Sequence, residues 1–221
     1  MTTYYLTGTD TDAGKTLAAC ALLQAFRAAG KTAIGMKPVA SGCAQTAHGW
    51  RNDDALKLQA NSDPRPDYAL VNPFALPDAT APEIAAGRAG VAVTLPIIES
   101  AFGQLQARAE IVLVEGVGGW MAPLATGLDQ CALARLCGAQ VILVVGMRLG
   151  CINHARLSAR AIAADGCELV GWIASEIDPG LAHADEYFRL LCAALPVPCL
   201  GRLPHTRAPD PRQLAGHLRL P

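Results

Sequence analysis

The sequence predicts an α/β fold in which a parallel β-sheet carries helices on both faces. Apolar strand-like runs alternate with helical patterns along the chain, as in other folds of this class. Several of these runs are continuous in Val, Ile and Leu, which is typical of strands buried on both faces. A glycine-rich turn that ends in Lys-Thr lies between the first run and the first helical pattern. The length of 221 residues suits one domain, so we expect a single domain over residues 1–221.

Six strands and six helices follow from these patterns. The predicted strands are Tyr4–Thr7, Thr32–Met36, Ile111–Glu115, Val141–Val145, Leu169–Ala174 and Pro198–Gly201. The predicted helices are Lys15–Ala29, Asp54–Ala60, Leu95–Arg108, Asp129–Cys137, Asn153–Asp165 and Ala182–Ala194. Gly30, Gly138 and Gly166 stand where helix C-caps belong. Asp63–Pro82 and the chain from Pro204 onward are rich in proline, which predicts loops.

Composition and charge exclude several classes of function. Hydrophobic residues make up 52% of the chain and charged residues 17%, which argues against disorder. A net charge of −1 favours neither nucleic acid nor an anionic membrane as partner. No apolar run reaches the length of a membrane span, and the N-terminus lacks a secretory signal, so we expect a cytoplasmic protein. The eight cysteines lack metal-site spacing and are expected to be free thiols.

Residues 8–16 read Gly-Thr-Asp-Thr-Asp-Ala-Gly-Lys-Thr and have the layout of a phosphate-binding loop. The unpaired N–H groups and partial positive charge of a helix N-terminus bind phosphate. Gly14 allows close approach of the backbone, Lys15 can reach the outer phosphates, and the Thr16 hydroxyl can ligate Mg²⁺. Five residues separate the two glycines, one more than usual, so a chance Gly-Lys-Thr is the alternative. The strand before and the helix after favour a P-loop NTPase-type fold.

Functional residues of such a sheet gather at the carboxyl ends of its strands. Lys37 follows the second strand, where a second lysine would suit a reaction that builds negative charge on a transferring phosphoryl group. A solvated lysine is the alternative. Glu115 ends the third strand before a Gly-rich turn, and a carboxylate there can hold Mg²⁺. Asp53 or Asp54 could supply a second carboxylate or cap the next helix, and spacing does not decide between them.

Two further places lie at this rim, Gly146–Asn153 after the fourth strand and Ser175-Glu176 after the fifth. Asn153 can cap the following helix, whose exposed N–H groups could hold an anionic ligand, and capping alone explains the residue equally well. No Ser, Cys or His occupies a nucleophile motif such as Gly-x-Ser-x-Gly.

Together these motifs resemble those of the dethiobiotin synthetases, ATP-dependent enzymes of biotin synthesis. The resemblance spans nearly the whole chain, and the family's loop carries the same extra residue. The matching segments are Gly-Thr-Asp-Thr-Asp-Ala-Gly-Lys-Thr (8–16), Lys-Pro-Val-Ala-Ser-Gly (37–42), Arg-Asn-Asp-Asp-Ala-Leu (51–56), Val-Asn-Pro (71–73), Leu-Val-Glu-Gly-Val-Gly-Gly-Trp (113–120), Val-Ile-Leu-Val-Val-Gly (141–146) and Leu-Gly-Cys-Ile-Asn-His-Ala (149–155).

The resemblance implies a ligase that closes a ureido ring on 7,8-diaminononanoate with CO₂ and MgATP. In the family's reaction one amine takes up CO₂ as a carbamate. The carbamate attacks the γ-phosphate to give a mixed carbamic–phosphoric anhydride, and the second amine closes the ring and expels phosphate. No protein nucleophile is needed, so catalysis would rest on positioning and charge stabilisation.

The resemblance also implies roles for individual residues. Lys15 and Lys37 would neutralise the phosphates, with Lys37 also near the carbamate. Thr16, Asp54 and Glu115 would hold Mg²⁺, which favours Asp54 over Asp53. The diamine or its carbamate would be oriented by Thr11, Ser41 and Gly118. The implied nucleotide contacts are Asp12, Ala13, Gly14, Lys15, Thr16, Leu17, Asp54, Glu115, Gly116, Val117 and Gly118.

The family's base pocket and subunit arrangement carry over in the same way. Ser175, Glu176, Pro204, His205 and Thr206 would form the base pocket. Close relatives place Asn where Ser175 stands, and Ser offers fewer donors and less reach. The family is a homodimer with sites at the subunit interface. The substrate carboxylate would be bound across that interface by Cys151, Asn153 and Tyr187.

Two other enzyme classes share the loop and the fold. Amide-forming synthetases of the cobyrinate type need a glutamine-hydrolysing domain, for which this chain is too short. Switch ATPases of the division-site and plasmid-partitioning type usually carry a second lysine inside the loop, where this chain has Asp10 or Thr11. A nucleotide-binding module without chemistry leaves Lys37 and Ser41 unexplained.

Overall fold

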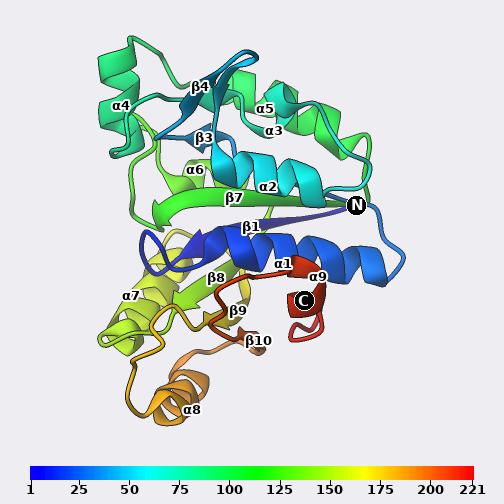
Figure 1. The fold of residues 1–221 in the computed structure, drawn as a ribbon. Helices are drawn as coiled ribbons and strands as arrows, with labels where there is room; N and C mark the ends of the chain where they lie inside the picture. Colours follow the sequence, from blue (N-terminus) through cyan, green and yellow to red (C-terminus); the bar gives the residue numbers. More distant parts are fainter.

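A six-stranded parallel sheet runs through the centre of the protein (Figure 1). The computed structural model describes residues 1–221. The strands lie in the order β10-β9-β8-β1-β7-β2. Their bounds are β1 (Thr2–Gly8), β2 (Ala33–Met36), β7 (Ile111–Gly119), β8 (Gln140–Gly146), β9 (Leu169–Ser175) and β10 (Cys199–Leu203). The predicted α/β fold and its six strands are therefore confirmed.

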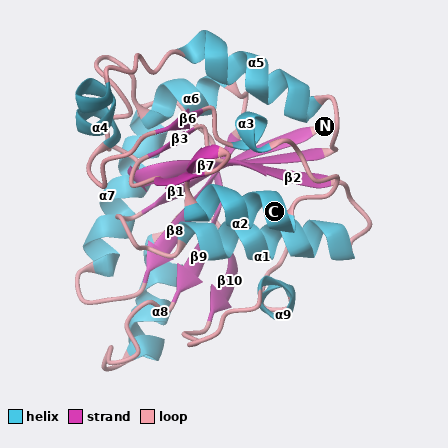
Figure 2. Ribbon diagram, turned by 45° about the horizontal axis from the view of Figure 1, so that its top comes forward, coloured by secondary structure: helices cyan, strands magenta, loops and turns pink.

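Helices cover both faces of this sheet (Figure 2). One face carries α1 (Lys15–Ala28), α2 (Asp53–Asn61) and the short C-terminal α9 (Pro211–Ala215). The other carries α4 (Pro82–Ala89), α5 (Leu95–Gln106), α6 (Gln130–Leu136), α7 (Cys151–Ala164) and α8 (Ala184–Ala194). Side chains of β1 alternate between the faces, since Tyr4 and Leu6 pack with α1 while Tyr5 packs with the opposite layer. No helix has the length and apolar character needed to cross a membrane.

The helix ends follow the sequence signals closely. Gly30, Gly138 and Gly166 each follow the C-cap residue of a helix and have φ of 77°, 55° and 68°. A left-handed residue there closes the helix, and glycine adopts this conformation without a steric cost.

The expectation that Asp63–Pro82 forms only a loop was wrong. The segment contains α3 (Tyr68–Val71) and β6 (Phe74–Ala75), and it buries Val71, Phe74 and Leu76. β6 pairs in parallel with β3 (Val39–Ala40), which lies in the predicted loop after β2. These apolar residues stabilise the segment by burial, although the prolines around them limit each element to a few residues.

Three more short elements were not predicted. β4 (Ala44–Thr46) and β5 (Gly49–Arg51) form an antiparallel hairpin, and α9 lies in the tail that was expected to be a loop. Leu214 of α9 is buried against the α1 layer, which fixes the tail beside α1 (Figure 1). Elements of three to five residues leave too little periodicity to be recognised in a sequence.

Candidate functional site

A cleft of about 380 Å³ opens at the carboxyl ends of the central strands, where β1 lies between β7 and β8. The order of strands along the sheet reverses at this point, and ligands of open α/β sheets bind there. Twelve of the thirteen lining residues are among those singled out from the sequence. The lining residues are Thr11, Asp12, Gly14, Lys15, Thr16, Leu17, Lys37, Ser41, Asn52, Asp54, Glu115, Val117 and Gly118.

The predicted phosphate-binding loop connects β1 to α1. Gly14 is the N-cap of α1 with φ of 86°, and no side chain caps the helix, so its first N–H groups remain available to an anion. The Lys15 ammonium donates to the Asp10 carbonyl oxygen at 2.9 Å, and Lys15 is 7% exposed. Burial lowers the pKa of Lys15, Glu115 opposes this change, and the nearby Lys37 adds repulsion. A bound anion would attract the Lys15 ammonium, and so offset the cost of burying its charge and the repulsion from Lys37.

The position of Gly14 also leaves no room for a side chain. A Cβ there would overlap the Ser175 hydroxyl, whereas a Cβ on Gly30, at φ of 77°, would meet nothing within 4 Å. We expect Gly30→Ala to lower the free energy of unfolding by about 1 kcal/mol for its φ alone. Gly14→Ala should cost more, because it adds the steric overlap. Urea denaturation of both variants checks this, and equal losses would show that the contact with Ser175 imposes no constraint.

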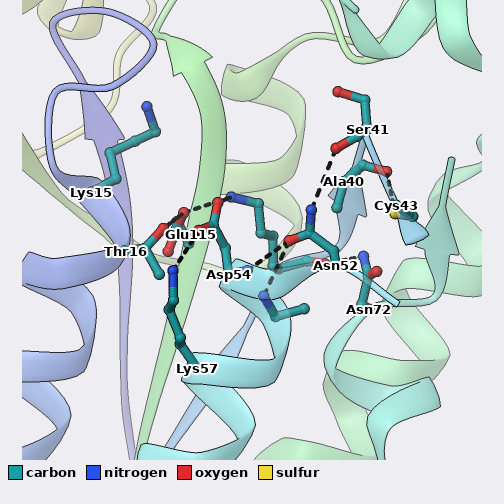
Figure 3. Close-up of polar contacts among 12 residues, drawn as sticks. Lys15, Thr16, Ala40, Ser41, Cys43, Asn52, Asp54, Lys57, Asn72 and Glu115 are labelled. Carbon is teal, nitrogen blue, oxygen red and sulfur yellow. Dashed lines mark hydrogen bonds and ion pairs between the residues drawn. The ribbon is translucent and has the colours of Figure 1, made fainter. Parts of the chain in front are cut away.

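Four polar side chains meet at the floor of the cleft. The Lys37 ammonium lies 2.7 Å from Glu115 Oε1 and 2.8 Å from Asp54 Oδ2. The Thr16 hydroxyl donates to the same Glu115 oxygen at 2.7 Å. Figure 3 shows Thr16, Glu115 and Asp54 pointing toward one another from α1, β7 and α2, while the side chain of Lys15, the first residue of α1, stands apart from them.

These contacts fix the charges of the cluster. Burial opposes a charge on Lys37, but Glu115 and Asp54 outweigh it and raise the pKa of Lys37 above its usual range. Burial likewise opposes a charge on Asp54, and Lys37 outweighs it and lowers the pKa of Asp54. Both pKa shifts favour a charged Lys37 between the two carboxylates.

The oxygen atoms of this cluster fit a magnesium ion. Glu115 Oε2 is buried and has no hydrogen-bond partner, so it is free to coordinate a cation. Asp54 and the Thr16 hydroxyl add further oxygen ligands. The chain has no group of three His, Cys, Asp or Glu placed to hold a metal. Mg²⁺ commonly binds through one or two carboxylates together with substrate phosphates and water.

Asn52 is the lining residue that the sequence analysis missed. Its Oδ1 accepts from the amides of Asp54 at 3.1 Å and Ala55 at 3.2 Å, so Asn52 is the N-cap of α2. The capping alternative for Asp53 and Asp54 was therefore wrong, and both lie in the first turn. Asn is a preferred N-cap, and its place before Asp-Asp and a helical pattern was a usable signal.

The predicted Gly-rich turn after Glu115 is instead part of a strand. β7 continues to Gly119, which pairs with Gly8, so Val117 and Gly118 line the cleft as strand residues. Gly116 and Ala13 are buried outside the lining. A Cβ on Gly116 would lie 2.6 Å from the Gln130 side chain, so this glycine serves packing.

The residues predicted for a base pocket come together beside the phosphate-binding loop, outside the cleft lining. Ser175 ends β9 and pairs with Leu203, the last residue of β10. The Glu176 carboxylate accepts from the His205 amide at 3.4 Å and forms an ion pair with Arg202 at 2.5 Å. Pro204 and Thr206 flank His205, so all five predicted residues lie at the ends of two paired strands.

The start of α7 differs from the expectation in one respect. Gly150 is the N-cap, with φ of 92°, so the prediction that Asn153 caps the helix was wrong. Asn153 is exposed in the first turn, and Cys151 is buried in a cluster against which Tyr187 of α8 packs. The structure thus brings Cys151 and Tyr187 to one cluster, away from the cleft lining of the same chain.

Comparison with known proteins extends this picture. A family model described as an AAA domain matches residues 2–213. A protein of Xanthomonas campestris pv. campestris named ATP-dependent dethiobiotin synthetase BioD is 57% identical over 218 residues, which cover 99% of this chain and 97% of that protein. The chain belongs to the dethiobiotin synthetase family. Another member, named in the same way, from Xylella fastidiosa, is 56% identical over 205 residues, covering 93% of this chain and 91% of its own.

Solved structures show the fold of this dethiobiotin synthetase family member in more distant proteins. The cell division protein FtsY of Thermotoga maritima matches with a TM-score of 0.57 and 15% identity, over 97% of this chain and 67% of its own. A signal recognition particle receptor FtsY from Elizabethkingia anophelis gives 0.54 and 14%, over 99% and 59%. At this identity the likeness concerns the fold alone, and it confirms the P-loop NTPase-type sheet. The close relatives do not favour a switch ATPase.

Proposed function

We propose that the protein is an ATP-dependent dethiobiotin synthetase, a cyclo-ligase that forms C–N bonds. The observation that carries the proposal is a buried lysine ammonium held between Glu115 and Asp54, within 2.8 Å of both, beside a phosphate-binding loop. Full-length similarity to proteins of that name supports the substrates, which are 7,8-diaminononanoate, CO₂ and ATP. The products are dethiobiotin, ADP and phosphate.

The proposed reaction has three steps. One amine of the diamine adds to CO₂ and loses a proton, which gives a carbamate. A carbamate oxygen attacks the γ-phosphorus, the bond to the bridging oxygen breaks, and ADP leaves. The second amine then attacks the carbamoyl carbon, loses its proton and expels phosphate, which closes the ring. The protein stabilises charge in each step and forms no covalent bond with the substrate.

Different residues have different roles in this reaction. Lys15 and Lys37 neutralise charge on the transferring phosphoryl group, and the position of Lys37 suits contact with the carbamate as well. When bound, Mg²⁺ neutralises the phosphate oxygens, and Thr16, Asp54 and Glu115 would hold it. Thr11 orients the diamine or its carbamate together with Ser41 and Gly118. Nucleotide contacts come from Asp12, Gly14, Leu17 and Val117 of the cleft lining, and the base lies against Ser175, Glu176, Pro204, His205 and Thr206.

We also infer a homodimer in which the partner's α7 completes the site. Leu149, next to the Gly150 N-cap of α7, is 80% exposed, and the partner subunit would cover this side chain. The Cys151–Asn153 turn, with Tyr187 close by, would bind the substrate carboxylate of the neighbouring subunit through its free N–H groups. The eight free thiols support a cytoplasmic location.

The direct test measures phosphate release from MgATP and bicarbonate, with and without 7,8-diaminononanoate, followed by mass analysis of the product. Phosphate release that depends on the diamine, with stoichiometric cyclic urea, is the expected result. ATP hydrolysis that ignores the diamine would contradict the proposal.

Ser175 is expected to relax the preference for ATP. A serine hydroxyl has less reach toward a base edge than the asparagine of close relatives, so discrimination between bases should weaken. Rates with ATP, CTP and GTP, compared between the wild type and Ser175→Asn, measure this. Strong rejection of CTP and GTP by the wild type would contradict the prediction.

A further inference from the structure

β2 is the edge strand of the central sheet, so Lys37 at its end has a strand neighbour on one side only. The residues Val71 and Asn72 cover the other side. The Lys37 amide donates to the Val71 carbonyl at 2.8 Å, and Asn72 Nδ2 donates to the Lys37 carbonyl at 2.7 Å. Both main-chain polar groups of Lys37 are therefore bound by two consecutive residues that do not line the cleft.

The side-chain amide of Asn72 has one possible orientation. Its Nδ2 donates to the carbonyls of Lys37 and Phe74, the second at 3.2 Å, and its Oδ1 accepts from the Tyr68 hydroxyl at 2.9 Å. A flipped amide would place an oxygen against two carbonyl oxygens. Asn72 is 3% exposed, so water cannot replace a lost partner.

The Tyr68 hydroxyl joins this amide to the start of α2. It donates to Asn72 Oδ1 and accepts from the Asn52 main-chain amide at 2.8 Å. Asn52 is the N-cap of α2 and lies two residues before Asp54. One hydrogen-bonded chain therefore runs from the backbone of Lys37, through Asn72 and Tyr68, to the helix that carries Asp54.

Asn52 extends the chain to a further part of the cleft. Its Nδ2 donates to the Ser41 carbonyl at 3.4 Å (Figure 3). Asn72 and Tyr68 thus tie the segment that presents Lys37 to the start of α2, which presents Asp54, and Asn52 ties the start of α2 to the segment that presents Ser41.

We propose that Tyr68 is a positioning residue whose hydroxyl sets the placement of Lys37 relative to Asp54. Its catalytic consequence rests on the proposed function, since the two side chains must meet the phosphates together. The guanidinium of Arg51 lies 4.2 Å from the Tyr68 ring centroid. Phenylalanine would keep this ring contact and lose only the hydroxyl, which makes the substitution specific.

The test compares Tyr68→Phe with Tyr4→Phe, a matched loss of a hydroxyl in β1 where the ring stacks on Phe26. Misplacement of reacting groups by a fraction of an ångström slows chemistry, so kcat of Tyr68→Phe should fall about tenfold while KM for ATP changes less than about twofold. Hydrogen exchange should quicken in residues 37–41 and 51–55 and stay unchanged elsewhere. Tyr4→Phe should alter neither readout.

A second variant, Asn72→Asp, keeps the side-chain size and the acceptor for Tyr68 but sets an oxygen against the Lys37 carbonyl. Because both substitutions break one chain, the double variant should lose no more kcat than the worse single variant. If the losses of kcat in the two single variants added up in the double variant, Tyr68 and Asn72 would not belong to one hydrogen-bonded chain.

The possible results distinguish a failure of the hydrogen-bonded network from a failure of the proposed function. Unchanged kcat in Tyr68→Phe, with faster exchange at both segments, would overturn the catalytic consequence. Unchanged hydrogen exchange at both segments, or faster exchange throughout the protein, would overturn the hydrogen-bonded network itself. If the wild type formed no cyclic urea, the proposed function would fail, and the exchange readout would still decide whether Tyr68 holds the two segments together.

Discussion

Replacing Lys37 with alanine should lower turnover by about a hundredfold or more while ATP binding remains largely intact. The ammonium lies 2.7 Å from Glu115 and 2.8 Å from Asp54, beside the cleft in which the phosphates are proposed to bind. A charge that acts on the transferring phosphoryl group stabilises the transition state more than the bound nucleotide. Steady-state kcat and the Kd for ATP, measured on the same preparation, check this.

The same substitution should also lower stability, in a way that depends on pH. Glu115 has no exposed side-chain surface and would lose its cation, which typically costs about 3 kcal/mol. The raised pKa of Lys37 stabilises the fold at pH values below its ordinary pKa, and the lowered pKa of Asp54 stabilises it above about pH 4. The difference in unfolding free energy between Lys37→Ala and the wild type should therefore be large at neutral pH and shrink as the pH falls below about 4.

Lys31→Ala is the matched control for both effects. Lys31 forms an exposed ion pair with Glu110, and exposed pairs of this kind contribute little to stability. Its kcat and stability should stay close to those of the wild type. Unchanged turnover in Lys37→Ala, with weaker nucleotide binding, would show that Lys37 only binds substrate.

The sequence predicted the sheet and most of the cleft because those features leave strong local signals. Apolar runs, several of them continuous, marked all six central strands, and the loop Gly8–Thr16 follows the first run directly. Parallel strands bring their carboxyl ends to one edge, so Lys37 and Glu115 could be placed together without knowledge of tertiary contacts.

The unpredicted parts depend on contacts between distant residues. Tyr68 and Asn72 lie among prolines in a segment whose short elements exist because they pack against β2 and β3. Asn52 reaches the cleft as the N-cap of α2, and in the sequence the adjacent Asp53 and Asp54 were the more obvious candidates for a functional role. In each case the deciding interaction joins residues that no sequence period connects.

Replacing Lys15 with alanine should weaken ATP binding itself, by about a hundredfold in Kd. Lys15 is 7% exposed and its ammonium has only the Asp10 carbonyl as hydrogen-bond partner, so two of its three donors remain for phosphate oxygens. Burial already lowers the pKa of Lys15, and the repulsion from Lys37 adds to this, so a bound polyphosphate gains more from this lysine than from an exposed one. Calorimetric titration with MgATP measures the change directly.

The two substitutions are therefore expected to affect different quantities when Kd for ATP and kcat are both measured. Lys15→Ala should raise Kd, whereas Lys37→Ala should lower kcat with a smaller change in Kd. The loss in Lys15→Ala should also remain when a non-hydrolysable ATP analogue replaces ATP, because it does not depend on phosphoryl transfer. Full affinity of Lys15→Ala for ATP would rule out phosphate binding by this lysine, and the N–H groups at the start of α1 would then carry that interaction alone.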